Sequence, residues 1–276
     1  MTPNTVKRNI AAVFDLIGIN TGGFAIQKIL FSPFIRVVNY HDIQSEHVAN
    51  FEKHLEFYRT RFVDVNEVTF RSFLNGAPWL HKKPGIIISF DDAMRSHFET
   101  AAPLLEKYGF TGWFFVPAGW IAERTGSNSE AKAAVADQKT LTLEQIRYLD
   151  ENHVVGCHTE THCRLSRDLP HEKLRFEILG ASASLKEILG HDVNIFCWVG
   201  GEEFSYSKEA ADLIRQRYDL SFMTNNAVVR PNTHPLQIQR TNIEAENPLS
   251  LVSFQLAGLL DLVYFPKRQR VNRLTR

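Results

Sequence analysis

The sequence predicts an α/β fold built on a parallel sheet, and three observations support this class. Short apolar runs alternate with helical patterns along most of the chain, which is typical of parallel sheets. The run 86–90 is almost entirely apolar and ends in two acids, Asp91 and Asp92, as expected for a buried strand whose carboxyl end faces a ligand. The 276 residues, 44% of them hydrophobic, suffice for one large core, and barrels reach this size as single domains.

Residues 1–33 are predicted to form an N-terminal helical extension. Apolar residues recur at helical spacing over 6–17, Gly22-Gly23 is expected to break the helix, and a second helical stretch covers 24–30. Asp15 interrupts any signal-peptide core and no convincing cleavage site follows, so we expect this segment to stay on the protein. Two interpretations stay open: the segment lies on a membrane surface or a partner, or it packs against the domain.

Residues 34–246 are predicted to form the main domain. Its expected elements are a strand at 34–42, a helix at 51–62, an extended stretch at 63–65, a helical turn at 70–74, the strand ending in the acid pair, a helix at 97–108, a strand at 112–116, a helix at 142–150 opened by a capping box, a strand before His158, a helix at 170–189 and a strand at 236–240. The polar stretch 119–138 is expected to be a mobile loop or lid.

Residues 247–276 are predicted to form an apolar helix followed by a basic tail. The stretch 249–265 is nearly all apolar, but it is too short and interrupted for a confident membrane span. We expect this helix to pack on the domain. The tail carries Lys267, Arg268, Arg270, Arg273 and Arg276, and it could contact anionic lipid or remain solvated.

The acid pair and two histidines are the strongest candidates for chemistry. Neighbouring strand residues point to opposite faces, so adjacent acids need a reason: one could bind a metal while the other takes a proton, or both could cap the next helix. His158 and His162 follow a second apolar run, and their spacing brings both rings to one face if the chain turns helically. Two histidines and one carboxylate make a three-ligand metal site with an open position, the catalytic kind.

These two motifs resemble those of a known family. Ser-Phe-Asp-Asp-Ala at 89–93 is similar to Thr-Phe-Asp-Asp-Gly, and His-Thr-Glu-Thr-His at 158–162 is similar to His-Ser/Thr-x-x-His, of the polysaccharide deacetylases. This is the NodB-homology family, carbohydrate esterase family 4. Similar order and spacing run from about Val37 to about Ile243. The resemblance implies a distorted (β/α)7 barrel and a metal-dependent hydrolase that removes the N-acetyl group of an amino sugar.

The resemblance also implies roles for individual residues. Asp91 corresponds to the catalytic base, and Asp92, His158 and His162 correspond to the ligands of one divalent metal, with Zn²⁺ as the expected ion. Such a metal lowers the pKa of bound water toward about 7 and polarises the scissile carbonyl, while an acid protonates the leaving amine. Thr159 is expected to orient a ligand through a hydrogen bond.

The chain departs from the family pattern at two catalytic positions. Cys197-Trp198-Val199-Gly200-Gly201 stands where the family has Arg-x-Pro-Tyr-Gly, so the arginine that tethers the base is missing there, and Arg95 or Arg240 could replace it. The last motif lacks its histidine acid, which leaves His234 or His41 as candidates. Trp198 could offer its ring to a sugar or lie in the core.

The composition limits the kinds of partner that we expect for this protein. The formal net charge is zero, so nothing indicates nucleic-acid binding. Three cysteines, an odd number, do not describe a disulfide framework, which indicates reduced thiols in the cytosol. We expect the substrate to be a nucleotide-linked or lipid-linked glycan used in bacterial surface polysaccharide synthesis, such as O-antigen, with membrane contact through the basic tail. Two alternatives remain open: a catalytically impaired carbohydrate-binding or scaffold protein, and a hydrolase of another sugar amide such as N-formyl.

Overall fold

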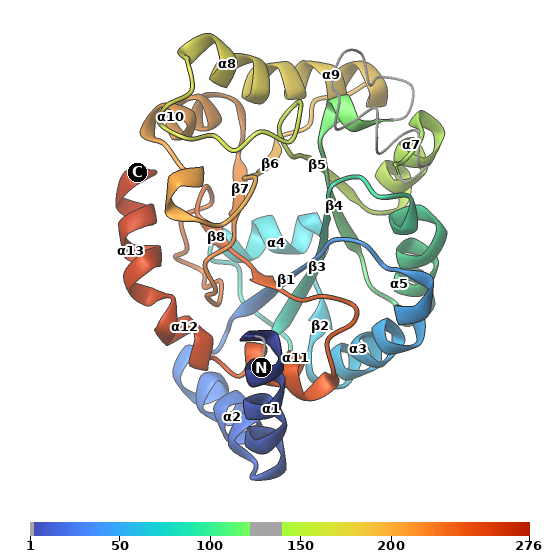
Figure 1. Ribbon diagram of the computed structural model, residues 1–276, viewed down its shortest axis with the longest axis vertical. Helices are drawn as coiled ribbons and strands as arrows, with labels where there is room; N and C mark the ends of the chain where they lie inside the picture. Colours follow the sequence, from blue (N-terminus) through green and yellow to red (C-terminus); the bar gives the residue numbers. More distant parts are fainter. Residues whose placement is uncertain (1–2, 122–139) are drawn as a thin grey trace.

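The structure is a computed structural model that describes residues 3–121 and 140–276, with side chains from residue 8 (Figure 1). Most of the loop predicted over 119–138 therefore lies outside the described residues. The predicted capping box is confirmed, because Thr142 and Gln145 exchange the two expected hydrogen bonds at the start of the following helix.

The centre of the molecule is a parallel sheet with strand order β8-β7-β6-β5-β4-β3-β1-β9. The short strand β2 pairs with β3 beside this path. The strands are β1 (Ile35–Tyr40), β2 (Val63–Asp64), β3 (Gly85–Asp91), β4 (Gly112–Val116), β5 (Val154–Cys157), β6 (Ile195–Cys197), β7 (Leu220–Met223), β8 (Ile238–Gln239) and β9 (Thr241–Asn242).

A single chain segment closes the sheet into a nearly complete barrel. β8 pairs with β7 and β9 pairs with β1, and only Arg240 separates these two strands in the sequence. At Arg240 the chain bends and passes from one edge of the sheet to the other. This bend closes the ring of strands. The predicted α/β barrel is confirmed.

Helices surround this barrel (Figure 1). α4 is seen through the ring, and its Phe70 packs on Trp113 and Phe222 inside the barrel. The helices are α1 (Pro3–Leu16), α2 (Ile19–Phe31), α3 (Val48–Arg61), α4 (Glu67–Leu74), α5 (Ala102–Tyr108), α7 (Leu143–Asn152), α8 (His171–Arg175), α9 (Ala181–Leu189), α10 (Lys208–Arg217), α11 (Leu249–Leu256), α12 (Leu259–Val263) and α13 (Phe265–Leu274), with π-helical turns at His97–Ala101 and Phe176–Gly180.

The two faces of each strand bury different clusters, as the period of two requires. In β3, Ile86, Ile88 and Phe90 belong to the larger cluster that includes residues of the surrounding helices, whereas Ile87 belongs to the cluster inside the barrel. Ser89 and Asp91 share the inward face with Ile87. This alternation places a polar layer at the carboxyl end of the barrel interior.

The break in the N-terminal extension differs from the prediction. The chain bends at Gly18, which has a left-handed φ of 78°, whereas Gly22 and Gly23 lie inside α2. Gly23 is accommodated there for packing: a Cβ at this position would lie 2.6 Å from the Ala257 carbonyl oxygen after α11. The close approach of α2 to this carbonyl therefore explains the glycine better than a helix break does.

The C-terminal segment forms three helices and leaves little free tail. Gly258, with φ 91°, separates α11 from α12. The basic residues that follow mostly have partners within the chain: Arg268 donates to the backbone carbonyls of Asn225 and Asn226, and Arg270 pairs with Glu203. These contacts fix α13 beside the barrel, so most of the predicted basic tail is neither free nor extended.

Candidate active site

Asp91 and Asp92 reach one site because the backbone turns sharply between them. Asp91 is the last residue of β3 and points into the barrel with Ile87 and Ser89. Asp92 has a φ of 78° and Ala93 a φ of 51°, both in the left-handed region that non-glycine residues rarely adopt. The turn sends the Asp92 carboxylate back toward the same cavity instead of to the opposite face. This strained backbone at neighbouring acids is typical of a functional site.

Arg240 holds Asp91 from the other side of the barrel. Its two terminal nitrogens donate to the two oxygens of the Asp91 carboxylate at 2.7 and 2.8 Å, and Asn39 donates to the same carboxylate at 3.0 Å. Burial would raise the pKa of Asp91, but the guanidinium of Arg240 and the ring of His158 outweigh burial and hold that pKa well below its usual range. Asp91 is therefore an ionised, rigidly oriented carboxylate.

The two histidines are presented by the turn after β5. His158 continues the inward face of that strand, and the backbone at Thr159 and His162 adopts left-handed φ values of 65° and 59°. The Thr159 hydroxyl accepts a hydrogen bond from the Cys163 N–H at 3.0 Å, so this side chain supports the turn that carries both histidines. The buried Glu177 carboxylate accepts two hydrogen bonds from Thr161 and supports the same turn.

Asp92, His158 and His162 together fit a metal ion. Asp92 Oδ1 lies 3.0 Å from His162 Nε2 and 3.6 Å from His158 Nε2, close to the spacing of about 3.3 Å that a tetrahedral Zn²⁺ site with bonds of about 2.0–2.1 Å requires. Among the residues that the structure describes, this buried oxygen has no polar partner other than the two imidazole nitrogens. The opposite nitrogen of His158, Nδ1, lies 2.9 Å from the Cys197 carbonyl, which fixes the tautomer that turns Nε2 toward the site.

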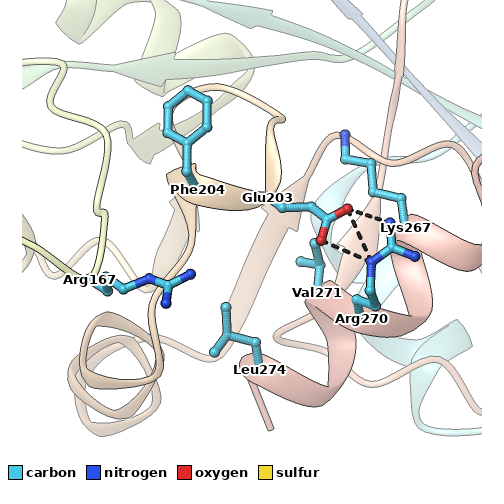
Figure 2. Close-up of a pocket in the computed structure, with 7 residues that line it drawn as sticks. All are labelled: Arg167, Glu203, Phe204, Lys267, Arg270, Val271 and Leu274. Atoms are coloured by element: carbon cyan, nitrogen blue, oxygen red, sulfur yellow. Dashed lines mark hydrogen bonds and ion pairs between the residues drawn. The ribbon is translucent and has the colours of Figure 1, made fainter.

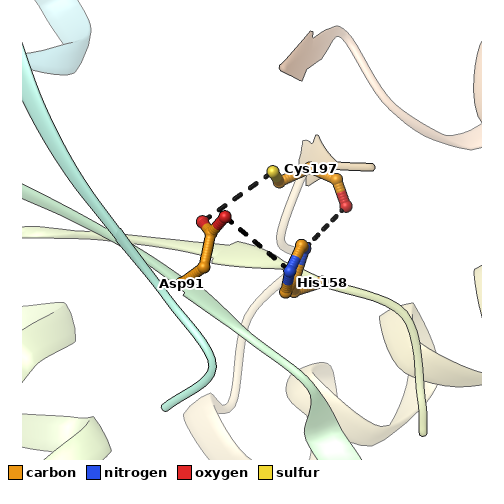
Figure 3. A group of neighbouring side chains, drawn as sticks. All are labelled: Asp91, His158 and Cys197. Carbon is orange, nitrogen blue, oxygen red and sulfur yellow. Dashed lines mark hydrogen bonds and ion pairs between the residues drawn. The ribbon is translucent and has the colours of Figure 1, made fainter. Parts of the chain in front are cut away.

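A second group, Asp91, His158 and Cys197, also brings three ligand atoms together (Figure 3). Both oxygens of Asp91 are already bonded to Arg240, so a cation between these residues would lie beside a guanidinium. Burial also raises the pKa of the Cys197 thiol, which disfavours the thiolate. The donor set with two histidines is therefore the better metal site.

A comparison with protein families matches half of the chain to one family. The model of the family described as polysaccharide deacetylase matches residues 81–218, which include both acids and both histidines. The chain belongs to the polysaccharide deacetylase family. No curated protein sequence matches the chain significantly.

Solved structures of deacetylases share the fold. The deacetylase PplD of Streptococcus pyogenes, in complex with acetate, has a TM-score of 0.65 at 19% identity, covering 81% of this chain and 98% of PplD. IcaB of Ammonifex degensii has a TM-score of 0.65 at 23% identity, covering 83% and 98%. A de-N-acetylase of Aggregatibacter actinomycetemcomitans has a TM-score of 0.64 at 16% identity, covering 81% and 100%.

Of the two candidate arginines, Arg240 is the one that contacts the Asp91 carboxylate. Arg240 takes the tethering position, because it continues the inward face of β8 after Ile238. Arg95 lies on the helix side of the acid turn, where its nearest described carboxylate is Glu99 at 3.9 Å. The arginine that the family motif places after β6 is thus supplied here from the barrel-closing segment.

His41 lies at the mouth and His234 does not. His41 follows β1, its Nδ1 lies 3.2 Å from the Glu244 carboxylate, and its backbone carbonyl accepts a hydrogen bond from buried His97. Burial lowers the pKa of His41, but the hydrogen bond to Glu244 and the charges of the two active-site acids outweigh it and raise that pKa to about 9. His234 precedes β8 and is exposed, which places it at the opposite end of the barrel.

The structure moves one predicted aromatic away from the site and adds another. Trp198 is 1% exposed and packs between Phe196 and Tyr206, so its ring belongs to the core and offers no open face to a sugar. Trp120, which sequence reasoning missed, is partly exposed with its ring centroid 4.9 Å from that of His162. Its position four residues after β4 was the available signal.

Asn39 and Glu177 were also missed. Asn39 is an inward-facing polar residue near the end of an apolar strand, and Glu177 interrupts the apolar pattern of the helix over 170–189. Both patterns are visible in the sequence, since a buried polar group on an apolar face needs a partner. Neither pattern tells which partner it has.

Proposed function

We propose that the chain is a metal-dependent N-deacetylase of an N-acetylated amino sugar, with Asp92, His158 and His162 holding one divalent metal. The observation that carries this proposal is the pairing of that ligand set with a separate carboxylate, Asp91, which Arg240 keeps ionised and oriented. The tether also weakens one of the two sequence arguments for a catalytically impaired protein, because Arg240 contacts Asp91 although no arginine follows β6 in the motif.

The residues divide the reaction between them. A bound Zn²⁺ would acidify water and polarise the amide carbonyl. Asp91 accepts the proton of the attacking water, and Asn39 and Arg240 hold its carboxylate in place. His41, oriented by Glu244 on the rim, donates a proton to the leaving amine. Attack on the amide carbon, protonation of nitrogen and cleavage of the C–N bond yield acetate and the free amino sugar.

We extend the proposal to surface polysaccharide biosynthesis, such as O-antigen, at the cytoplasmic face of a membrane. The names of the structural neighbours, which include polysaccharide deacetylases, support the substrate class. The three free thiols, Cys157, Cys163 and Cys197, support a reducing compartment.

The test measures metal content and acetate release together. Protein stripped with a chelator and reconstituted with Zn²⁺ should bind about one equivalent and release acetate from N-acetylglucosamine oligomers. Asp91→Asn should lower kcat by about 10²–10⁴-fold with unchanged metal content, because it removes the base and leaves all three metal ligands in place. The exposed control Asp168→Asn should match wild type. Full turnover by Asp91→Asn would exclude this residue as the base.

Metal binding has its own control pair. His158→Ala should lose the metal, whereas the exposed His171→Ala should retain it. Acetate release by chelator-treated protein at the wild-type rate would contradict the metal dependence.

A further inference from the structure

A groove of about 820 Å³ runs from the barrel mouth to the helical flank of the molecule. At the mouth it is lined by Thr224, Asn242 and Glu244. Asn242 accepts a hydrogen bond from Asn39, and Glu244 contacts His41, so this end of the groove borders the catalytic residues directly. A substrate that fills the active site therefore has an exit for its non-reacting part along this groove.

The other end of the groove is mainly apolar and opens on exposed apolar side chains, although Arg8, paired with Glu246 at 2.9 Å, also lines the groove. Leu251, Phe254 and Leu260 line it together with Ile10 and Val263, which are 43% and 70% exposed. An apolar wall offers few hydrogen bonds to a polar sugar, whereas burying a hydrocarbon chain against it is energetically favourable.

The surface around this opening is apolar far beyond the groove. The exposed apolar side chains of α1, α2 and α12, of Ile17 between α1 and α2, and of the first residue of α13 form what we call the apolar flank: Ile10, Val13, Leu16, Ile17, Ile19, Ile26, Ile29, Leu30, Leu262, Val263 and Phe265. Residues 8–31 include only three charged residues, Arg8, Asp15 and Lys28. An exposed helical pair facing water normally carries a charged outer face, so this surface indicates an apolar partner.

The flank is fixed to the barrel and cannot swing away freely. Buried Gln27 donates to the Leu256 carbonyl, Arg36 pairs with Asp261 at 2.8 Å, and Phe14 packs edge-on against Phe254. Figure 1 shows α1 and α2 projecting at one end of the molecule beside α11 and α12. The apolar residues thus form a supported surface continuous with the groove.

The composition of this surface favours a bilayer. Among the described residues no single helix is long and apolar enough to cross a membrane, but Arg8–Leu16 and Ile19–Phe31, bent by 78°, reach the required length and apolar composition as a pair. Because this pair is packed on the barrel, it suits a position along the interface, with its outer side chains in the acyl boundary.

A second cleft adjoins the groove, and its lining carries more positive charge. Figure 2 shows that cleft, where Glu203 pairs with Arg270 of α13 and Arg167, Phe204, Val271 and Leu274 lie around them. Its cationic lining suits an acidic group, whereas the groove leads to hydrocarbon. Lys267 lines both, at the point where they adjoin.

We propose that the apolar flank rests on a membrane surface and that the groove receives the hydrocarbon anchor of a lipid-linked amino sugar. This inference rests on the proposed function for the sugar end and names the class of its carrier. The mouth holds the N-acetyl sugar, the groove holds the first part of the lipid chain, and the flank places the opening at the bilayer from which that chain comes.

Binding to a series of glycosides tests the groove without turnover. Asp91→Asn protein is titrated with methyl, octyl and dodecyl glycosides of N-acetylglucosamine, below their micelle concentrations, by calorimetry. The dodecyl glycoside should bind at least about tenfold more tightly than the methyl glycoside. Adding Val263→Asp should abolish this gain, and adding the equally exposed Val68→Asp of α4 should not. Equal affinity across the series, or equal loss in both variants, would overturn the groove assignment.

Vesicle flotation tests the flank. Wild type should float with vesicles of phosphatidylcholine and phosphatidylglycerol, Leu16→Asp/Ile29→Asp should remain in solution, and Val68→Asp should float. Wild type that stays in solution would overturn the membrane contact.

Two outcomes separate the lipid anchor from the deacetylase activity. Acetate release without any dependence of affinity on chain length would leave the deacetylase standing and remove the lipid anchor. Chain-length-dependent binding without acetate release from any glycoside would do the opposite.

Discussion

The two halves of the barrel mouth follow the family pattern to different degrees. The half formed by β3 and β5 supplies Asp91, Asp92, His158 and His162 from two contiguous motifs. The half formed by β6 and β8 has lost its motif arginine, yet Arg240 makes two hydrogen bonds to the same carboxylate from another strand. An arginine on a different segment can therefore hold Asp91, whereas the metal ligands depend on the local backbone of two turns.

The backbone explains this contrast. Four residues of the β3 and β5 turns, Asp92, Ala93, Thr159 and His162, have left-handed φ values, so the position of each ligand is tied to an unusual local conformation. Arg240 needs no such turn, because a long guanidinium side chain reaches Asp91 from an ordinary inward position. A tether is therefore easier to move between strands than a ligand is.

Removing the relocated arginine should have the largest effect. Arg240→Gln leaves Asp91 buried without its partner, and breaking a buried ion pair costs about 3–5 kcal/mol of unfolding free energy. The control Arg71→Gln removes a surface pair with Glu67 and should cost no more than about 1 kcal/mol. Urea unfolding measures both values. Equal losses in the two variants would mean that the ion pair between Arg240 and Asp91 does not stabilise the fold.

The sequence indicated that the acids and histidines of the first half of the mouth lie together, because its signals are local. Each motif spans five residues and contains its own candidate ligands. The acids and histidines could therefore be chosen as candidates without a structure. Arg240 lies 149 residues from Asp91, and its role depends on the strand β8–β9 bending from one sheet edge to the other. The alternation of Ile238 and Arg240 indicated an inward side chain, but not its partner across the barrel.

The misplaced helix break has the same origin. Gly22-Gly23 has the composition of a break, but Gly23 is required by the close approach of α2 to Ala257, a contact between segments far apart in the sequence. Propensity could not distinguish a glycine that ends a helix from one that lets another segment approach.

His41, on the rim of the barrel, is the candidate acid of the half formed by β6 and β8. If His41 completes the altered half as the acid, His41→Gln should lower kcat by about 10²–10⁴-fold while the metal content remains unchanged. The exposed His81→Gln serves as control. Steady-state acetate release and elemental analysis measure the two quantities, and unchanged kcat in His41→Gln would assign the acid elsewhere.

The interaction of His41 with Glu244 should also appear in the pH dependence of stability. The folded-state pKa of His41 is raised to about 9, above an unfolded value of about 6.5, so its stabilising contribution is complete below about pH 6.5 and is lost as the pH rises through about 9. In metal-free protein, Glu244→Gln should therefore be less stable than wild type at pH 6, with the gap closing toward pH 10. A gap independent of pH would contradict this pairing.

The smallest effect is expected at the position where the motif arginine is missing. Cys197 contributes its backbone carbonyl to His158, at 2.9 Å, whereas its thiol only approaches Asp91 at 3.9 Å. Cys197→Ala keeps the carbonyl, so metal content should be unchanged and kcat should fall less than about tenfold, the lower end of what contacts behind a metal ligand are worth. A thiol-directed role would instead make Cys197→Ala lose metal, as His158→Ala does. That result would place the metal between Asp91, His158 and Cys197 instead.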